Sequence, residues 1–327
     1  MGYLYALLGA LLFGANGSLA KLLVNGGLSA TQLTLFRSLG TALLAGLILL
    51  ITDRAQFRLA PRQLAVMAVL GIAGVALLQS SYAAALGLLP VGITLLIEYT
   101  AVLMVAVVAF IFFKERVRAR LWVAIGLVLL GLTAVARPWE ARLDPLGVVF
   151  ALVAAVTLAL YFIVGERQVG RTSPLAVAFW TMLFASAFWA LFSGWWTLDP
   201  GIFSKPLDVG GQWGSWVLPL GIPLLVTVVA GSFAPFMLSL SALKRLSATA
   251  AGITASAEVI FAFAVAWVWL GESVDSFGII GASIVVIGIV LAQTARANKV
   301  VDADLVLPAH PLPAQHRGAE PSVGGRT

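Results

Sequence analysis

Chemically reactive side chains are scarce in this chain of 327 residues. It contains no cysteine, which excludes disulfides, thiol nucleophiles and cysteine metal sites. Its two histidines, His310 and His316, both lie in a polar C-terminal segment, so we expect no metal and no cofactor. There is no GxxxxGK(S/T) phosphate loop, and the apolar segments contain neither HExxH nor GxSxG. We therefore expect no enzyme activity.

Charge is rare as well. Charged residues make up 10% of the chain and apolar residues 61%, against roughly a quarter and a half in soluble domains. Most side chains must face hydrocarbon or one another, which predicts an integral membrane protein. The apolar runs are too continuous for the alternating strands of a membrane barrel, and a span of about 20 residues is satisfied by a helix. We predict an all-α membrane protein with ten transmembrane helices at about residues 2–23, 30–51, 63–87, 90–113, 119–137, 145–165, 173–196, 215–242, 247–270 and 275–295.

Positive charge is distributed unevenly between the two sides of these spans. With a cytoplasmic N-terminus, thirteen Lys and Arg flank the spans on the cytoplasmic side and four on the other. Cytoplasmic loops normally hold the excess, so both termini are predicted to be cytoplasmic. The same surplus explains the high sequence pI without a nucleic-acid partner. The thirteen are Arg54, Arg58, Arg62, Lys114, Arg116, Arg118, Arg120, Arg167, Arg171, Lys244, Arg245, Arg296 and Lys299; the four are Lys21, Arg137, Arg142 and Lys205.

The chain contains an internal repeat. Residues 86–115 and 243–272 align without a gap at an offset of 157, and each copy is a long apolar run interrupted by one carboxylate, Glu98 or Glu258. Similar glycines follow at the same offset in the next apolar segment. Five spans in each half is an odd number, so the second half must enter the membrane from the other side. Inverted repeats place a site near the midplane, between the halves, and open it alternately to each side.

Two further alignments extend the repeat to the start of each half. GALLFGANGSLAK lies on AAVTLALYFIVGE, which pairs Asn16 with Tyr161. SATQLTLFRS lies on SPLAVAFWTM, which pairs Arg37 with Thr181.

The chain resembles a known family in several of these features. They are two five-helix halves, an arginine early in span two (LFRS), and spans that end in FFKE and WLGE and precede a Gly-rich span (GLVLLGL, GASIVVIGIV). The pattern resembles the drug/metabolite transporter superfamily, EamA type, over about residues 2–295. Within it the chain is similar to the bacterial YddG-type exporters of aromatic amino acids. The resemblance implies a ten-helix inner-membrane exporter with a central cavity.

Three charged residues lie within the predicted spans. A charge inside a bilayer costs roughly 2.5–3.5 kcal/mol on insertion scales, so each one suggests a function. Arg37 and Glu98 lie at similar depth, which allows either an ion pair that fixes packing or contact with substrate. Glu258 lies near the midplane, with no basic residue of another span at an obviously matching depth. Burial then favours its neutral form, so proton coupling is one hypothesis and a permanently protonated side chain is the alternative.

Polar and aromatic side chains within the spans suggest a substrate site. Gln79 and Tyr82 are three residues apart and share one helix face, while Tyr99 follows Glu98. Aromatic groups with a few polar ones suit an amphipathic zwitterion, although each residue alone is also explained by helix packing. The predicted substrate-binding residues are Asn16, Gln79, Tyr82, Glu98, Tyr99, Tyr161, Trp180, Met237 and Ser239, with Arg37 and Glu258 as coupling or structural charges.

Helix-weakening residues occur in two spans. They are the GANG sequence in span one and Pro219, Pro223 and Pro235 in span eight, where we predict bending. The domains are predicted as residues 1–143 and 144–295, one five-helix repeat each, followed by a Pro-rich disordered cytoplasmic tail, 296–327.

Together these features predict a monomeric secondary transporter of the bacterial inner membrane. It would export amino acids, aromatic ones by preference and other neutral ones such as threonine, by alternating access, with protons as a candidate coupling ion. The alternative within transport is an exporter of drugs or other small metabolites. From other classes, a membrane-embedded enzyme and a channel remain, and saturable flux stimulated by counterflow would separate a carrier from a pore.

Overall fold

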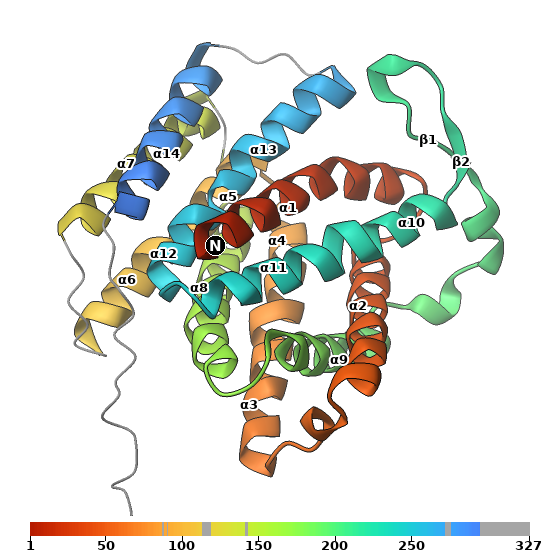
Figure 1. The fold of residues 1–327 in the computed structure, drawn as a ribbon. Helices are drawn as coiled ribbons and strands as arrows, with labels where there is room; N and C mark the ends of the chain where they lie inside the picture. The colour runs from red at the N-terminus through yellow and green to blue at the C-terminus, as the bar shows by residue number, and fades with distance from the viewer. Residues whose placement is uncertain (87, 90, 113–118, 141–142, 272–275, 295–327) are drawn as a thin grey trace, which may run out of the picture. The chain divides into compact units, whose positions relative to one another are not determined.

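Helices form nearly all the regular structure of the protein (Figure 1). The structure is a computed structural model that describes residues 1–86, 88–89, 91–112, 119–140, 143–271 and 276–294. Residues Met1–Arg296 form one compact unit. The predicted disordered tail lies outside the described residues, as do the ends of both aligned repeat segments at Glu115 and Glu272.

Nine helical stretches of the described residues are long and apolar enough to cross a membrane. The last helix contains a shorter apolar run, Ser276–Ala292, so the tenth span and the orientation of the termini stay predictions. The helices are α1 (Gly2–Asn25), α2 (Ala30–Thr52), α3 (Pro61–Gly71), α4 (Leu78–Leu86), α5 (Val91–Tyr99), α6 (Ala101–Ile111), α7 (Ala119–Ala136), α8 (Pro145–Val169), α9 (Pro174–Phe192), α10 (Gly221–Val228), α11 (Ala234–Leu243), α12 (Ala248–Ala255), α13 (Ala257–Val265) and α14 (Ser276–Thr294).

Local sequence explains where several helices begin. Ser29 and Gln32 form a capping box at α2, in which each side chain bonds the backbone N–H of the other. Ser173 and Ser247 cap α9 and α12 with their hydroxyls. Asp144 accepts two backbone N–H bonds at the start of α8. The chain therefore carries its own start signals on both sides of the repeat boundary.

Four spans are interrupted within their length. π-helical turns η2 (Ile72–Leu77) and η7 (Val229–Phe233) divide spans three and eight, and η8 (Ala266–Leu270) ends span nine. Spans four and nine also break, between α5 and α6 and between α12 and α13. Pro235 lies in the first turn of α11, directly after η7, so the predicted weakening there is confirmed. Helix α1 runs through GANG without a break, so bending there stays a prediction.

The connection before span eight contains a β-hairpin, which corrects the purely helical prediction. Strands β1 (Pro206–Asp208) and β2 (Val217–Pro219) pair antiparallel, with Leu207 opposite Leu218. Helix α10 therefore begins at Gly221, several residues later than the predicted start at 215. The reason is local, because the Asp208 carboxylate accepts hydrogen bonds from within the turn and keeps those residues out of the helix.

The Asp208 carboxylate makes the hairpin sensitive to acid. Hydrogen bonds from the Gly210 N–H, the Ser215 hydroxyl and the Trp216 N–H lower its pKa below the ordinary value of 3.8. A lowered native pKa stabilises the hairpin above the unfolded value, and this contribution is lost as pH falls through the native value. We expect the Trp216 amide to lose hydrogen-exchange protection below about pH 4. Asp208→Asn should lack this transition, and an identical transition in Asp208→Asn would exclude Asp208 as its origin.

Close contacts between spans recur in both repeats, at positions related by the sequence alignments. A Cβ on Gly71 of α3 would lie 2.9 Å from Phe184 Cβ of α9. In the other repeat, a Cβ on Gly40 of α2 would lie 2.4 Å from Val228 Cγ1 of α10. The offset of 157 relates Gly71 to Val228, and the register that pairs Arg37 with Thr181 relates Gly40 to Phe184. The same contact therefore forms twice, with the glycine on opposite partners.

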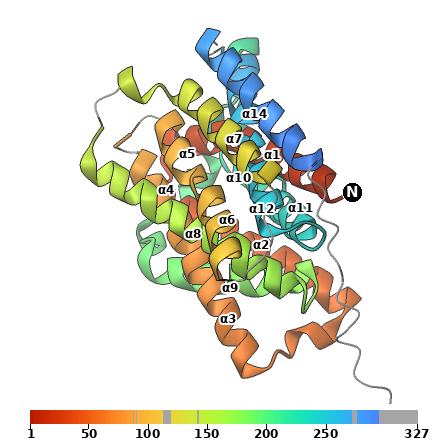
Figure 2. The ribbon, with the colours of Figure 1, turned by 90° about the vertical axis from the view of Figure 1, so that its left-hand side faces the viewer.

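Helices α7 and α14 pack along each other through small residues, and both views show them side by side (Figures 1 and 2). A Cβ on Gly131 would lie 2.6 Å from Gly281 O, and one on Gly288 would lie 3.0 Å from Ala124 O. The two contacts are equivalent in the internal repeat, because the offset of 157 relates Gly131 to Gly288 and Ala124 to Gly281. Small residues allow such close backbone approach in membranes.

Substitution of Gly131 by alanine should destabilise this helix pair. The added methyl would meet the backbone of α14, which cannot move aside as a flexible side chain can, and overpacking typically costs about 1–3 kcal/mol. Gly126→Ala on the same helix is the matched control, because a Cβ there meets nothing within 4 Å. We expect thermal unfolding in detergent to shift down for Gly131→Ala and not for Gly126→Ala. Equal shifts in the unfolding temperature of the two variants would mean that the contact at Gly131 does not contribute to stability.

Candidate functional site

Five ionisable residues from both repeats form a group that we call the polar cluster: Arg37 of α2, Tyr82 of α4, Glu98 and Tyr99 of α5, and Glu258 of α13, of which Arg37, Tyr82 and Glu258 are partly buried. Glu258 interacts electrostatically with each of the other four. Glu98 and Tyr99 are 9% and 3% exposed. Two carboxylates and one guanidinium therefore share a low-dielectric space, where a charge is tolerated only with partners.

The Tyr99 hydroxyl joins the two repeats at the break in span nine. It lies 2.8 Å from Glu258 Oε2 and 3.0 Å from Ala255 O, the last carbonyl of α12. A phenol has one proton, so it donates fully to the carboxylate or to the helix-end carbonyl. When Glu258 is ionised it is the stronger acceptor, and when it is protonated it can itself donate to Tyr99 while Tyr99 donates to Ala255.

Arg37 reaches the π-helical turn of span eight. Its Nη2 donates to Gly231 O at 3.1 Å, and the Thr41 hydroxyl bonds the neighbouring Ser232 hydroxyl at 3.0 Å. No ion pair joins Arg37 to Glu98 in the described part of the chain, although their similar depth suggested one. Its electrostatic partner is Glu258, the residue for which no basic neighbour was predicted. Depth along a span does not determine which helices adjoin, and this explains both differences.

Asn16 of α1 packs against the same π-helical turn, η7. A Cβ on Gly231 would come within 1.9 Å of Asn16 Oδ1, so only glycine allows this approach. Asn16 is 7% exposed. Because Arg37 bonds the Gly231 carbonyl, side chains from α1 and α2 converge on one residue of η7.

Three buried polar atoms among the predicted site residues have no hydrogen-bond partner. They are Asn16 Oδ1, Arg37 Nε and Gln79 Oε1. An unsatisfied buried donor or acceptor costs about 1–3 kcal/mol. Two acceptors and one donor among the predicted site residues thus have no hydrogen-bond partner in the structure.

Gly231 was not predicted, although the repeat contains a signal for it. The offset of 157 relates it to Gly74, and the first alignment relates Asn16 to Tyr161. In the structure, a Cβ on Gly74 would lie 3.4 Å from Tyr161 Cα, so the Gly74–Tyr161 contact is the counterpart of Gly231–Asn16. A search for small residues at repeat-related positions would have found the pair.

The remaining predicted residues lie apart from these contacts or in apolar packing. The Tyr161 hydroxyl donates to Ser239 Oγ at 3.3 Å, and the Tyr161 ring packs edge-on against Phe236. Met237 packs against the main hydrophobic core. Trp180 donates from Nε1 to Gln56 O at 3.2 Å and so ties α9 to the α2–α3 connection. The structure thus gives Trp180 a packing role and does not bring it to the polar cluster.

Within the described ranges, no three His, Asp or Glu side chains come together as metal ligands. The site is instead a set of buried hydrogen-bonding and charged groups enclosed by apolar helices from two repeats. Such an arrangement can recognise and release a small polar molecule.

The fold and the site define a multi-pass membrane transporter. Residues 1–137 and 145–294 both match the EamA-like transporter family, and the chain belongs to that family. An uncharacterized transporter of Archaeoglobus fulgidus is 26% identical over 213 residues, which is 65% of this chain and 71% of the relative. A protein known from its crystal structure shares the fold, with a TM-score of 0.72 at 17% identity over 90% of this chain and 96% of that chain.

Proposed function

We propose that this transporter exports amino acids, aromatic ones by preference, across the bacterial inner membrane by alternating access between two inverted five-helix halves. The observation that carries the proposal is the set of unpartnered buried atoms on Asn16, Arg37 and Gln79, which come from the first three spans. Arg37 offers an N–H to a substrate carboxylate. The amide oxygens and the Glu258 carboxylate offer acceptors to a substrate ammonium.

Aromatic surroundings support the preference for aromatic substrates. Tyr99 belongs to the main core, and Tyr82 packs against that core beside the charged groups. Rings stack or meet edge-on with a gain of about 0.5–1.5 kcal/mol per pair beyond their burial. A zwitterion with an aromatic side chain would satisfy both the polar and the apolar groups of this site.

A second candidate is an exporter of amine drugs or other cationic metabolites. The polar cluster has two carboxylates and one guanidinium, so its charge count also suits a cation without a carboxylate. The two candidates differ in one chemical group of the substrate, the carboxylate that would bind Arg37.

The test is counterflow in liposomes that contain the purified protein, with three molecules of one scaffold as competitors. Phenylalanine has both charged groups, phenethylamine lacks the carboxylate, and 3-phenylpropionate lacks the amine. We expect saturable phenylalanine flux that the other two compete for weakly. Equal or stronger competition by phenethylamine would favour the second candidate, an exporter of amines. Absence of saturable flux for all three, in vesicles with folded protein, would overturn the proposal.

A further inference from the structure

The connection between α9 and α10 forms an ordered hairpin, residues 205–219, which we call the strap. Its strands pair in register, and the Val209 N–H donates to Trp216 O at 2.9 Å. The bonds to Asp208 described above close its turn. The strap is therefore a hydrogen-bonded element of its own and can transmit a constraint between the helices that it touches.

The base of the strap is attached to the end of α1. Lys205 Nζ donates to Gly26 O at 2.9 Å, directly after the last residue of α1. Leu207 of β1 packs against a small apolar cluster that includes Leu23 and Leu220. A charged hydrogen bond and apolar contacts together hold this attachment.

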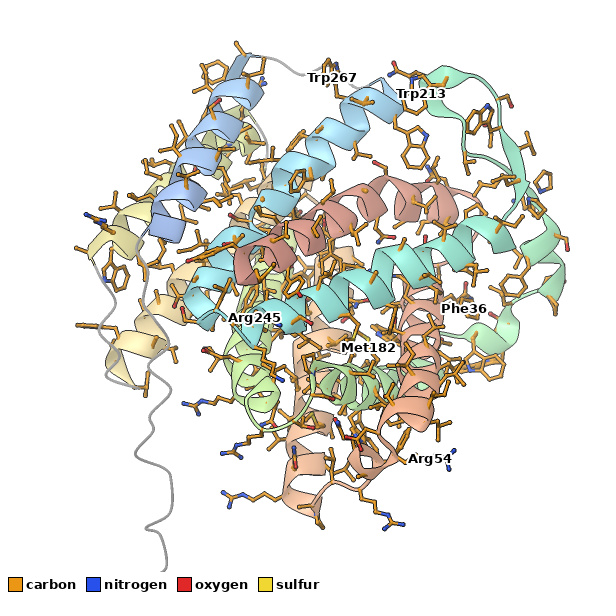
Figure 3. The ribbon with its side chains drawn as sticks, in the orientation of Figure 1. Phe36, Arg54, Met182, Trp213, Arg245 and Trp267 are labelled. Carbon is orange, nitrogen blue, oxygen red and sulfur yellow. The ribbon has the colours of Figure 1, made fainter. Side chains whose placement is uncertain are left out.

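The tip of the strap is attached to the end of span nine. Trp269 Nε1 donates to Val209 O at 2.9 Å, and the Gln212 side-chain amide donates to Val268 O. Figure 3 shows Trp213 of the strap beside Trp267 of span nine. The Gln212 bond satisfies a backbone carbonyl at the end of a helix, which otherwise has no partner within it, and the Trp269 bond satisfies a backbone carbonyl of the strap.

The two helices that the strap joins both carry residues of the site. Asn16 lies on α1, and Glu258 lies on α13. Between them α1 packs tightly on α13, because a Cβ on Gly14 would lie 2.7 Å from Glu258 O. The strap thus ties the ends of two adjacent helices, one from each repeat, on one side of the site.

The corresponding connection in the first repeat has no such hairpin. It runs between α2 and α3 over residues 53–60, all of them described, and contains only the short helix η1 (Arg54–Phe57). The Gln56 side-chain oxygen accepts from the Thr172 and Ser173 hydroxyls before α9, and the Gln56 backbone carbonyl accepts from Trp180 Nε1 within α9. The hairpin is therefore an asymmetric addition to a fold that is otherwise repeated.

We propose that the strap sets the resting state of the carrier by favouring the conformation that is closed on the strap's own side. The inference rests on alternating access in the proposed function. In inverted-repeat carriers the two halves exchange conformations between the inward-open and outward-open states, which would make the states nearly equal if the repeats were identical. Among the described residues, the strap's attachments to α1 and to span nine are more extensive than the Gln56 bonds of the α2–α3 connection. The two states are therefore held unequally, and breaking the strap's bonds shifts the population toward opening on that side.

The first test loosens the strap and measures access to the site. Gln212→Ala with Trp269→Phe removes the side-chain hydrogen bonds that Gln212 and Trp269 form between the strap and span nine. Because the chain contains no cysteine, Gln79→Cys supplies a single reporter thiol in the site. A membrane-impermeant maleimide is added from the strap side of intact spheroplasts or inverted vesicles, and labelling of a single cysteine at exposed Ser204 identifies that side. We expect the loosened protein to label roughly three- to tenfold faster for each bond removed.

The second test locks the strap. A Cβ on Gly271 would lie 3.7 Å from Gln212 Cβ, within the range for a disulfide, so Gln212→Cys with Gly271→Cys should cross-link. Gly271 has φ 71°, where a cysteine is strained, so Gly271→Cys alone is the control. Labelling of the reporter at position 79 is followed by peptide mass spectrometry before and after reduction. We expect slow labelling in the oxidised protein and recovery on reduction.

The outcomes separate the strap from the transport function, because labelling needs no substrate. Faster labelling after loosening and reversible protection after locking would establish the strap even if amino acids are not transported. Unchanged labelling in both folded variants would overturn it, whether or not phenylalanine is transported. Slower labelling after loosening would also overturn it, because the strap would then favour the open state.

Discussion

Arg37→Gln should reduce phenylalanine flux roughly 10- to 100-fold, because a hydrogen bond to a charged group contributes about 1.5–3 kcal/mol. The variant removes the only guanidinium of the polar cluster and leaves Glu258 without its basic partner. It also removes the donor at Nε that is unpartnered in the structure and available to a substrate carboxylate. Counterflow of phenylalanine at several concentrations measures the effect.

Two controls separate recognition from folding. Arg245→Gln removes an exposed arginine whose guanidinium lies 4.8 Å from the centre of the Tyr5 ring, and it should leave flux within about twofold. Phenethylamine has no carboxylate, so Arg37→Gln should weaken its competition far less than that of phenylalanine. If folded Arg37→Gln loses recognition of both molecules equally, Arg37 fixes helix packing and does not bind the carboxylate.

Much of the architecture follows from the sequence because membrane helices have a simple physical signature. Apolar length predicts the spans, and the ungapped offset between the halves reappears in the structure as paired contacts such as Gly131–Gly281 and Gly288–Ala124. The hairpin was not predicted, because its strands are three residues long and depend on hydrogen bonds to Asp208. Short strands fixed by a turn carry almost no periodic pattern.

For the candidate site, the sequence indicated which polar residues lie within the spans but not which of them are in contact. Asn16, Gln79 and Arg37 all present unpartnered buried atoms, and Glu258 contacts Tyr99 directly. The partner of Arg37 could not be predicted, because helix adjacency depends on tilt and on π-helical turns such as η7. Counting residues along a span gives an approximate depth but neither the tilt of the helix nor the position of a π-helical turn.

Glu258→Gln should remove the pH dependence of phenylalanine binding. Under the proposed function, a proton and the substrate ammonium compete for the Glu258 carboxylate, so KM should fall as pH rises. Glutamine keeps the shape but is neutral at every pH, so its KM should be flat and roughly 10- to 100-fold higher than the native value at alkaline pH, the usual weight of a charged hydrogen bond. KM measured between about pH 5.5 and 8.5 on both proteins tests this.

Two conservative variants show which carboxylate carries the effect. Glu98→Gln leaves Glu258 intact and should keep the native slope of KM with pH, while a flat profile would assign the proton to Glu98. Tyr99→Phe keeps the ring and removes the donor shared by Glu258 and Ala255. Without that donor the ionised form of Glu258 is less stable, so the pH at which KM changes should move upward while the slope remains. An unchanged midpoint in Tyr99→Phe would mean that Tyr99 donates to Ala255 in both protonation states.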